Sequence, residues 1–257
     1  MLIASWNVNS ITVRLPHLLD WLKSASPDHL CLQELKTVEE KFPFDQLSEI
    51  GYSAHVVGEK TYNGVAILSK STTECVSKFL PGSPEPLQSR LIEVCVDGVY
   101  ILNLYVPNGS EVGSAKYEYK LAWFKALISY IEERHVKNGV VTDKLVICGD
   151  FNIAPDDRDV HDPAEWVGQV LVSEPERDCF RQLINLGMID SFREFEQGAG
   201  HFSWWDYRMM AFRLNRGLRI DHVLLSHELA KACVAFKVDK MTRKLERPSD
   251  HAPVIIE

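Results

Sequence analysis

The clearest indication of the fold is the segment Leu145-Val146-Ile147-Cys148-Gly149-Asp150-Phe151-Asn152. Its first four residues form a short apolar run, which is typical of a fully buried strand. The run ends at Gly149, and a carboxylate and an amide follow at once. Side chains two residues apart in an extended chain point to the same side. We therefore expect a buried strand that delivers Asp150 and Asn152 to one edge of a sheet.

The same pattern, an apolar segment that runs into a polar residue, occurs at other places in the chain. These segments are Met1-Leu2-Ile3-Ala4-Ser5-Trp6-Asn7, His29-Leu30-Cys31-Leu32-Gln33-Glu34 and Leu218-Arg219-Ile220-Asp221, and the tail adds Ser249-Asp250-His251. One such strand end is ordinary, but several with acid, amide or imidazole groups indicate a site at the rim of a sheet.

Length and composition indicate an ordinary globular protein. With 257 residues, 46% of them hydrophobic and 25% charged, the chain suits one domain over residues 1–257. No apolar run approaches the length of a membrane span, and the N-terminus lacks the basic flank and apolar core of a secretory signal, so we expect a cytoplasmic protein without a membrane partner. The six cysteines form no C-x-x-C pair, which argues against a zinc cluster or a disulfide framework.

The net charge of −8 argues only weakly against nucleic-acid binding. Carboxylates gathered around a metal contribute to that total, so a local basic face can still bind a polyanion.

Periodicity predicts an α/β fold in which strands outnumber helices. We expect helices at 13–24, 115–135, 173–187 and 227–232, the third opened by a capping box from Ser173 to Glu176. Strands are expected at 1–6, 29–33, 53–57, 64–69, 75–80, 90–96, 99–106, 145–148, 218–226, 235–239 and 254–256, with Asp97-Gly98 as a hairpin turn. Residues 154–172 and 201–219 look irregular. Hairpins mixed with βαβ units predict stacked mixed sheets with helices outside.

The polar residues at the segment ends have the chemistry of a metal site. They are Asn7, Glu34, Asp150, Asn152, Asp221, Asp250 and His251. Hard oxygen donors without thiolates suit Mg²⁺ or Mn²⁺, and a nearby Asp can orient an imidazole. Taken singly, each residue has an ordinary explanation: a solvated strand end for Glu34, a turn cap for Asp150 or Asp250, and a structural hydrogen bond for His251.

Seven motifs in order raise the set above these explanations. They are Ser5-Trp6-Asn7-Val8-Asn9, Leu32-Gln33-Glu34-Leu35-Lys36, Tyr62-Asn63-Gly64-Val65-Ala66, Tyr105-Val106-Pro107-Asn108, Gly149-Asp150-Phe151-Asn152-Ile153-Ala154-Pro155, Gly217-Leu218-Arg219-Ile220-Asp221 and Arg247-Pro248-Ser249-Asp250-His251-Ala252-Pro253. With them the chain resembles the exonuclease III-type apurinic/apyrimidinic endonucleases of the endonuclease/exonuclease/phosphatase superfamily from residue 1 to 257. The resemblance implies a DNase I-like four-layer α/β sandwich, with two stacked mixed β-sheets flanked by helices.

The resemblance also implies roles for matching residues. Glu34 is expected as the principal metal ligand, with Asn7, Asn9 and Asp250 near the metal. The expected catalytic residues are Asp150 on the attacking water, Asn152 and Tyr105 on the phosphate, His251 beside the scissile phosphate and Asp221 orienting it. Lys36, close to the metal carboxylate, and Asn108 are expected to bind substrate.

Residues 201–219 carry the remaining substrate candidates. Aromatic side chains interleaved with arginines, from Phe202 to Arg219, can stack on a sugar or base and bind phosphates. The resemblance places Trp204, Leu218 and Ile220 in the wall of an abasic-sugar pocket, and Arg208 is a substrate-binding candidate among the interleaved arginines. The ordinary alternative is a half-buried aromatic loop with solvated arginines. Thr12 departs from the family pattern, because many relatives have arginine there.

These observations predict a Mg²⁺-dependent DNA repair phosphodiesterase, with Mn²⁺ as an alternative ion. It would act as a monomer on double-stranded DNA, by incision 5′ to abasic sites, by 3′-to-5′ exonuclease action or by cleaning of 3′ ends. Two alternatives stay open: a phosphatase or phosphodiesterase of the same superfamily on lipid head groups or other non-DNA substrates, and a catalytically inactive DNA-binding module. A binding surface gains nothing from clustered acids that face phosphate, which disfavours the last.

Overall fold

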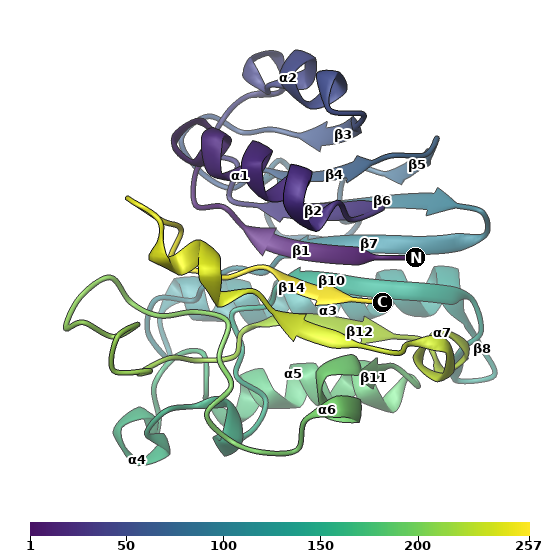
Figure 1. Ribbon diagram of the computed structural model, residues 1–257. Helices are drawn as coiled ribbons and strands as arrows, with labels where there is room; N and C mark the ends of the chain where they lie inside the picture. The colour runs from purple at the N-terminus through teal and green to yellow at the C-terminus, as the bar shows by residue number, and fades with distance from the viewer.

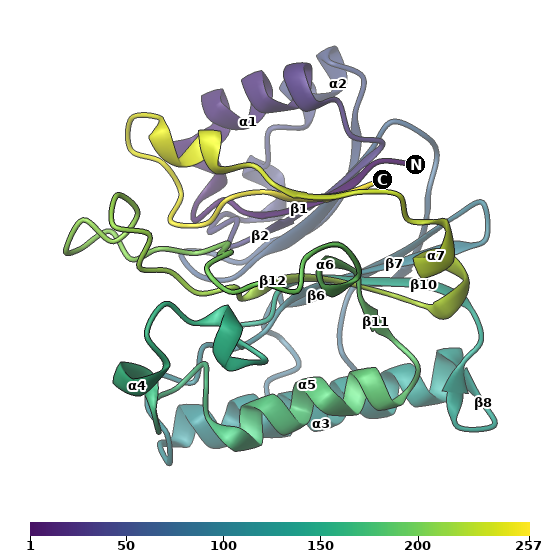
Figure 2. The ribbon, with the colours of Figure 1, turned by 60° about the horizontal axis from the view of Figure 1, so that its bottom comes forward.

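Two six-stranded β-sheets packed face to face form the centre of the protein (Figure 1). The computed structural model describes all residues from 1 to 257. Helices α1 (Ile11–Ala25) and α2 (Phe44–Glu49) cover the outer face of the first sheet, and α3 (Ala115–His135) and α5 (Glu174–Asn185) cover the second (Figure 2). The layers therefore run helix, sheet, sheet, helix, which confirms the predicted four-layer α/β sandwich.

The first sheet has the strand order β13-β14-β1-β2-β4-β3. The strands are β1 (Ile3–Asn7), β2 (His29–Gln33), β3 (Ser53–Val57), β4 (Val65–Ser69), β13 (Phe236–Val238) and β14 (Val254–Ile256). Strands β1 and β2 are parallel and joined by α1, which makes a βαβ unit, whereas β14 runs antiparallel to β1.

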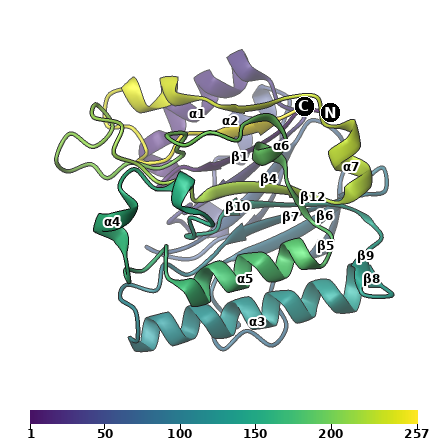
Figure 3. The ribbon, with the colours of Figure 1, turned by 90° about the horizontal axis from the view of Figure 1, so that it is seen from below.

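The second sheet has the order β11-β12-β10-β7-β6-β5. Its strands are β5 (Glu74–Ser77), β6 (Leu91–Val96), β7 (Val99–Tyr105), β10 (Lys144–Asp150), β11 (Ile189–Asp190) and β12 (Asp221–Leu225). Strands β7 and β10 are parallel, and β12 is antiparallel to β10. Figure 3 shows α3 and α5 side by side across the outer face of this sheet.

Shorter elements complete the chain. They are the hairpin β8 (Val136–Lys137) and β9 (Val140–Val141), the helices α4 (Pro163–Trp166), α6 (Ser191–Phe195) and α7 (His227–Ala232), and 3₁₀ turns at Glu39–Lys41, Asp157–Asp159 and Lys240–Lys244. None of the helices is long and apolar enough to cross a membrane.

The burial of β10 on both faces explains why its residues 145–148 are all apolar. Val146 and Cys148 pack into the core between the two sheets, whereas Leu145 and Ile147 pack under the helices of the outer layer. A strand buried on both faces reads as a continuous hydrophobic run rather than an alternating one.

One rim of the sandwich collects strand ends from both sheets. Parallel strands β1 and β2 end there in the first sheet, and parallel strands β7 and β10 end there in the second. Antiparallel strands β12 and β14 begin at the same rim. Just before this rim, strand β10 can accommodate only glycine at position 149. A Cβ there (φ +139°) would lie 1.9 Å from the carbonyl oxygen of Leu104.

Most predicted elements occur, within a few residues of the expected bounds. The capping box of Ser173 and Glu176 forms, and Asp97 and Gly98 both adopt the positive φ that their hairpin turn needs. The strand predicted at 218–226 is wrong at its start: β12 begins at Asp221, and Leu218 lies in an irregular segment that bridges to Trp204 and Val160. The short helices α2, α4 and α6 were not predicted. Elements of four to six residues show little helical period, although the six-residue helix α7 was predicted.

Candidate active site

Asn7 connects the two sheets at the rim. Its Nδ2 donates to Oε1 of Glu34 at 2.8 Å and to Oδ2 of Asp150 at 2.9 Å. One ligand atom each of Glu34, Asp150 and His251 lies within 4.8 Å of the others. Strand β2 delivers the first of these residues and β10 the second, so the sandwich brings together groups that are far apart in the sequence.

The imidazole of His251 is held by Asp221. Nδ1 of the imidazole lies 2.9 and 3.0 Å from the two carboxylate oxygens, and the hydroxyl of Ser203 donates to Oδ2 of Asp221 at 2.6 Å. Nε2 of His251 faces Asp150, 3.7 Å from its Oδ2. The ring is therefore oriented by one carboxylate and presents its second nitrogen toward the other.

Burial and mutual charge set the protonation of these groups. Burial raises the pKa of Asp150 to about 7; the nearby His251 opposes this shift, while the Asp221 and Glu34 carboxylates add to it. Burial lowers the pKa of His251, but the carboxylates of Asp221 and Asp150 outweigh it and raise that pKa to about 10. The imidazole is accordingly a charged hydrogen-bond donor at neutral pH, beside a carboxyl group poised near neutrality.

Asp250 belongs to a second group of contacts, next to the first. Its Oδ1 accepts from Nδ2 of Asn9 at 2.9 Å, and its Oδ2 accepts from Nε1 of Trp204 at 3.0 Å. Lys36 joins the two groups, because its Nζ lies 2.5 Å from Oδ1 of Asn9 and 2.8 Å from Oε2 of Glu34. The predicted metal ligands thus lie in one continuous network.

Asn152 and Asn108 form a pair of amides beside Asp150. Nδ2 of Asn108 donates to Oδ1 of Asn152 at 3.0 Å, and Nδ2 of Asn152 donates to the carbonyl of Val106 at 3.0 Å. Each Nδ2 carries two hydrogens, so each amide keeps one donor beyond the contact described. The backbone N–H of Asn152 donates to Oδ1 of Asp150 at 2.9 Å.

Tyr105, at the end of β7, is half-buried near the acids. Burial, followed by the Glu34 and Asp150 carboxylates, raises its pKa well above the ordinary range, so the phenol keeps its proton. The guanidinium of Arg90 lies 4.8 Å from the centre of the tyrosine ring and donates to the Tyr105 carbonyl at 3.2 Å. Tyr105 can therefore donate a hydrogen bond from a fixed position.

Four residues of the site, Asn9, Glu34, Lys36 and Asn152, have a left-handed backbone. Glu34 has a φ of +52° and Asn152 a φ of +50°. Such angles are uncommon outside glycine, and strain of this kind gathers at functional sites. Glu34 and Asn152 stand just beyond the ends of β2 and β10, where the left-handed turn redirects the chain.

The donor set fits a hard divalent cation. The cluster offers carboxylate oxygens, amides and one imidazole, without any thiolate. The neighbouring carboxylates contribute to raising the pKa of Asp150, which means that negative charge in the cluster is not fully compensated. A cation near Glu34 would relieve that repulsion.

Residues 201–219 are partly core and partly surface. Phe202 and Trp205 are buried, and so is Arg219, which pairs with Asp159 and Asp190. The expectation that Arg219 belongs to a DNA-facing set of arginines is therefore wrong: two buried carboxylates draw its guanidinium inward. Arg208 is exposed and pairs with Asp206 on a loop that projects at the left of Figures 1 and 2.

The three apolar candidates lie together. Leu218 and Ile220 are buried in a small cluster with Ala154, Val160, Leu171 and Val172, and Trp204 packs against that cluster while partly exposed. The two aliphatic side chains are therefore buried, and the indole is the part that a ligand can reach.

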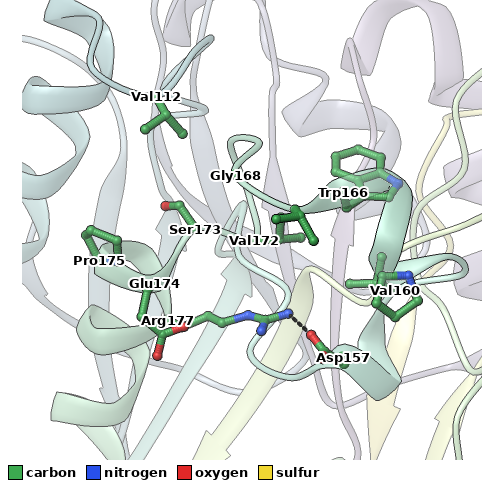
Figure 4. Close-up of a pocket in the computed structure, with 12 residues that line it drawn as sticks. Val112, Asp157, Val160, Trp166, Gly168, Val172, Ser173, Glu174, Pro175 and Arg177 are labelled. Atoms are coloured by element: carbon green, nitrogen blue, oxygen red, sulfur yellow. Dashed lines mark ion pairs between the residues drawn. The ribbon is translucent and has the colours of Figure 1, made fainter.

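Two hollows adjoin the cluster. One, of about 370 Å³, is lined by Glu34, Lys36, Tyr105 and Asn108 among others. The second, of about 660 Å³, is lined by Trp204, Trp166 and Arg208 among others, and the backbone of Trp204 bridges to that of His251. A third hollow, of about 520 Å³, lies between α4 and the start of α5 (Figure 4). It contains none of the predicted site residues, and Arg177 pairs with Asp157 across it.

Some residues that shape the site were not identified from the sequence. Ser203 supports Asp221, and Lys120 is fully buried on α3 with its amine beneath Asn108 and Asn152. The available signal for Lys120 was its spacing: it lies four residues before Phe124, on the apolar face of the helix. A charge at a core position calls for a buried partner.

Comparison with known proteins agrees with this geometry. Residues 4–251 match the model of the Endonuclease/Exonuclease/phosphatase family. The chain is 34% identical to exodeoxyribonuclease III of Haemophilus influenzae, over 100% of this chain and 99% of that protein. It superposes with a TM-score of 0.95 and 44% identity on the 3′ phosphatase NExo from Neisseria bound to a product DNA hairpin, covering 100% of this chain and 98% of the other. An AP endonuclease from Archaeoglobus fulgidus gives a TM-score of 0.94 and 37% identity, over 100% and 98% of the two chains.

Proposed function

Because the chain belongs to the Endonuclease/Exonuclease/phosphatase family, we propose that it is a DNA repair phosphodiesterase that hydrolyses duplex DNA with the help of Mg²⁺. Its relatives are exodeoxyribonuclease III and AP endonucleases, and the chain is an enzyme of that hydrolase class. The proposal adds the substrate, the ion and the residue roles. The experiment below distinguishes two activities. One is incision 5′ to abasic sites, and the other is removal of nucleotides or blocking groups at 3′ ends.

One observation carries the proposal: Asp221 orients His251, His251 faces Asp150, and Asn7 ties Asp150 to Glu34. Two acids and an imidazole of raised pKa therefore surround a single point at the rim. A site for hydrolysis of a phosphodiester needs a group that aligns water, donors for the nonbridging oxygens and stabilisation of the leaving oxygen.

Each residue then has a role that follows from its position. Asp150 accepts a proton from the attacking water or aligns it, because its pKa of about 7 lies near the working pH. His251 donates to the phosphate through Nε2, since Asp221 occupies Nδ1. The free amide hydrogens of Asn152 and Asn108, with the Tyr105 hydroxyl, complete the donors to the phosphate oxygens.

Glu34 is the proposed principal ligand of the cation, with Asn7, Asn9 and Asp250 close by. When bound, the ion supplies Lewis acidity for the charge that develops on the phosphate and the leaving oxygen. Mg²⁺ suits one or two carboxylates completed by water and phosphate, and Mn²⁺ can replace it in such a site.

The DNA contacts are assigned to the two hollows at the rim. Lys36 and Asn108 would contact the strand in one, and Trp204 over Leu218 and Ile220 would receive an abasic sugar in the other. Arg208 on its projecting loop would contact backbone phosphates. This aromatic and basic loop favours DNA over a lipid head group or another small phosphate ester.

We further propose that residues 1–257 act as one catalytic domain and as a monomer. The support is that both sheets of one chain supply the site: Asn7 and Glu34 come from the first, and Tyr105 and Asp150 from the second. Light scattering during active incision would test this, with a mass of one chain as the expected result and an activity that requires dimers as the contrary one.

The proposal is tested with three labelled duplexes: one with a single abasic site, one with a 3′-phosphate end and one with an intact 3′ end. Each is incubated with Mg²⁺, with Mn²⁺ and with EDTA. The Asp150→Asn variant is the matched control for a contaminating nuclease. We expect cleavage of at least one damaged duplex in Mg²⁺ and none in EDTA. Binding without cleavage of any duplex would contradict the proposal and favour the inactive DNA-binding module.

A further inference from the structure

Lys120 is the one fully buried lysine on α3, and its amine contacts three acceptors at once. Nζ lies 2.7 Å from the carbonyl oxygen of Asn152 and 3.1 Å from that of Asn108, and it forms an ion pair with Oε1 of Glu176. An ammonium has three hydrogens, so all of them are used. None is left to reach a substrate.

Glu176 is equally buried and fully occupied. In addition to its ion pair with Lys120, the Glu176 carboxylate accepts three hydrogen bonds. The donors are the backbone N–H of Leu171 at 3.0 Å, the N–H of Ser173 at 3.2 Å and the Ser173 hydroxyl at 2.5 Å. The carboxylate therefore fixes the start of α5 and the segment before it. Through the carbonyl of Leu171, which accepts from Ala154 at 2.8 Å, that segment holds the chain just after Asn152.

A buried ion pair of this kind is seldom present for stability. Removing two charges from water offsets much of their attraction, and apolar residues of similar size often serve the core as well. What an apolar residue cannot do is donate hydrogen bonds in fixed directions to two main-chain carbonyls. Here both carbonyls belong to the asparagines whose amides contact each other at the rim.

We propose that Lys120 and Glu176 are positioning residues, which set the separation and tilt of the Asn108 and Asn152 amides toward the phosphate. Neither touches the substrate. Gly109 supports this arrangement, since a Cβ there (φ +96°) would lie 3.2 Å from Cδ of Lys120, so the loop that carries Asn108 rests directly on the lysine stem. The inference rests on the phosphodiesterase function proposed above.

The test compares Lys120→Met, which keeps the length of the stem, with Glu176→Gln, which keeps the shape of the acid. Single-turnover cleavage and DNA affinity are measured for both, at a temperature where circular dichroism confirms the fold. A displacement of about 1 Å in a catalytic group can cost on the order of a hundredfold in rate. We expect the rate to fall by about 10- to 100-fold for Lys120→Met, with the dissociation constant for DNA nearly unchanged.

A matched control separates positioning from loss of stability. Glu93 is also a fully buried acid paired with a cation, His135, at the other end of α3. Glu93→Gln should lower the melting temperature and leave the cleavage rate unchanged. In addition, Lys120→Met should slow an enzyme that carries both Asn108→Ala and Asn152→Ala very little, because the two amides that it positions are already gone. Full additivity, or equal rate losses for Glu93→Gln and Lys120→Met, would overturn the proposal.

A second readout does not depend on cleavage. In ¹⁵N spectra the side-chain amide of Asn152 should exchange slowly with solvent and show one resonance pair. It should exchange faster and broaden in Lys120→Met but not in Glu93→Gln. Wild-type protein that cleaves no duplex would refute the proposed function alone, whereas unchanged amide exchange in Lys120→Met would refute the positioning role.

Discussion

Asp150 and Asp221 are register partners: the last residue of β10 lies opposite the first residue of antiparallel β12. The two carboxylates differ in what they contact. Asp221 is bound to Nδ1 of His251, whereas Asp150 stands 3.7 Å from Nε2 of the same ring. The imidazole lies between two acids that have different roles: Asp221 orients the ring, and Asp150 remains available to bind water.

Asp221→Asn should lower the single-turnover rate by at least about 100-fold, because the His251 ring loses both its orientation and the charge that favours its protonated form. Ser203→Ala, which removes only a hydrogen bond to Asp221, should cost far less. The double variant Asp221→Asn with His251→Gln should be no slower than His251→Gln alone. Independent, multiplicative losses in quench-flow measurements would argue against this coupling.

Glu34→Gln should raise the Mg²⁺ concentration needed for half-maximal cleavage by about tenfold or more, since an anionic oxygen ligand is replaced by a neutral one. The control is Glu39→Gln, an exposed acid that pairs only with Lys78. Metal titrations of the two variants and the wild type give the comparison. If Glu34→Gln shows a wild-type Mg²⁺ dependence, Glu34 is not the principal ligand.

Arg208→Ala should weaken binding to duplex DNA several-fold and reduce the slope of log K against log[salt] by about one, as expected for the loss of one phosphate contact. Arg181→Ala is the matched control: this arginine is also exposed and pairs with a nearby acid, Asp178, on α5. Fluorescence anisotropy at several salt concentrations measures both. Equal salt slopes for Arg208→Ala and the wild type would exclude the contact.

His222 should make the fold sensitive to acid. Burial, and then the charge of Arg219, lowers its pKa from 6.5 to about 4, and its Nε2 donates to the carbonyl of Ile153 at 2.8 Å. Between those two pKa values the unfolded chain binds a proton that the folded protein does not. The stabilisation is therefore complete above pH 6.5 and is lost as the pH falls toward 4, by up to about 1.4 kcal/mol per pH unit.

The measurement is the free energy of unfolding from urea titrations at pH 7 and pH 5, for the wild type and for His222→Gln. Asp150, whose pKa is raised to about 7, contributes in the opposite direction over the same interval, so only the difference between the two proteins isolates His222. The variant should lose less stability on acidification. The same pH dependence in both proteins would mean that the histidine is not held neutral.

The polar residues at the rim of the sandwich could be predicted from the sequence, because each is marked by the apolar segment directly before it. Asn7, Glu34 and Asp150 each follow an apolar strand directly, and parallel strands necessarily end at a common edge. Asp221 was expected inside a strand over residues 218–226 and is the first residue of β12, because Leu218 bonds to the irregular segment at Trp204 and Val160 and not to the sheet.

The supporting charges were beyond sequence reasoning for a different reason. The spacing of Lys120 places it on the apolar face of α3, but its partner and that of Arg219 are 56 and 60 residues away in the chain, and no local pattern identifies them. Residues 154–172 and 201–219 have no periodicity, so the conformations that bring Ser203 to Asp221 and Trp204 to Asp250 depend on tertiary contacts alone.

The most direct test of the account is single-turnover cleavage of a duplex with one abasic site or a 3′-phosphate end, by the wild type and by Asp150→Asn, both saturated with DNA in Mg²⁺. The account predicts that the wild type cleaves and that EDTA stops it. It also predicts that Asp150→Asn binds the same DNA with similar affinity while its rate falls by at least about 1,000-fold. An Asp150→Asn enzyme that cleaves near the wild-type rate would contradict the account.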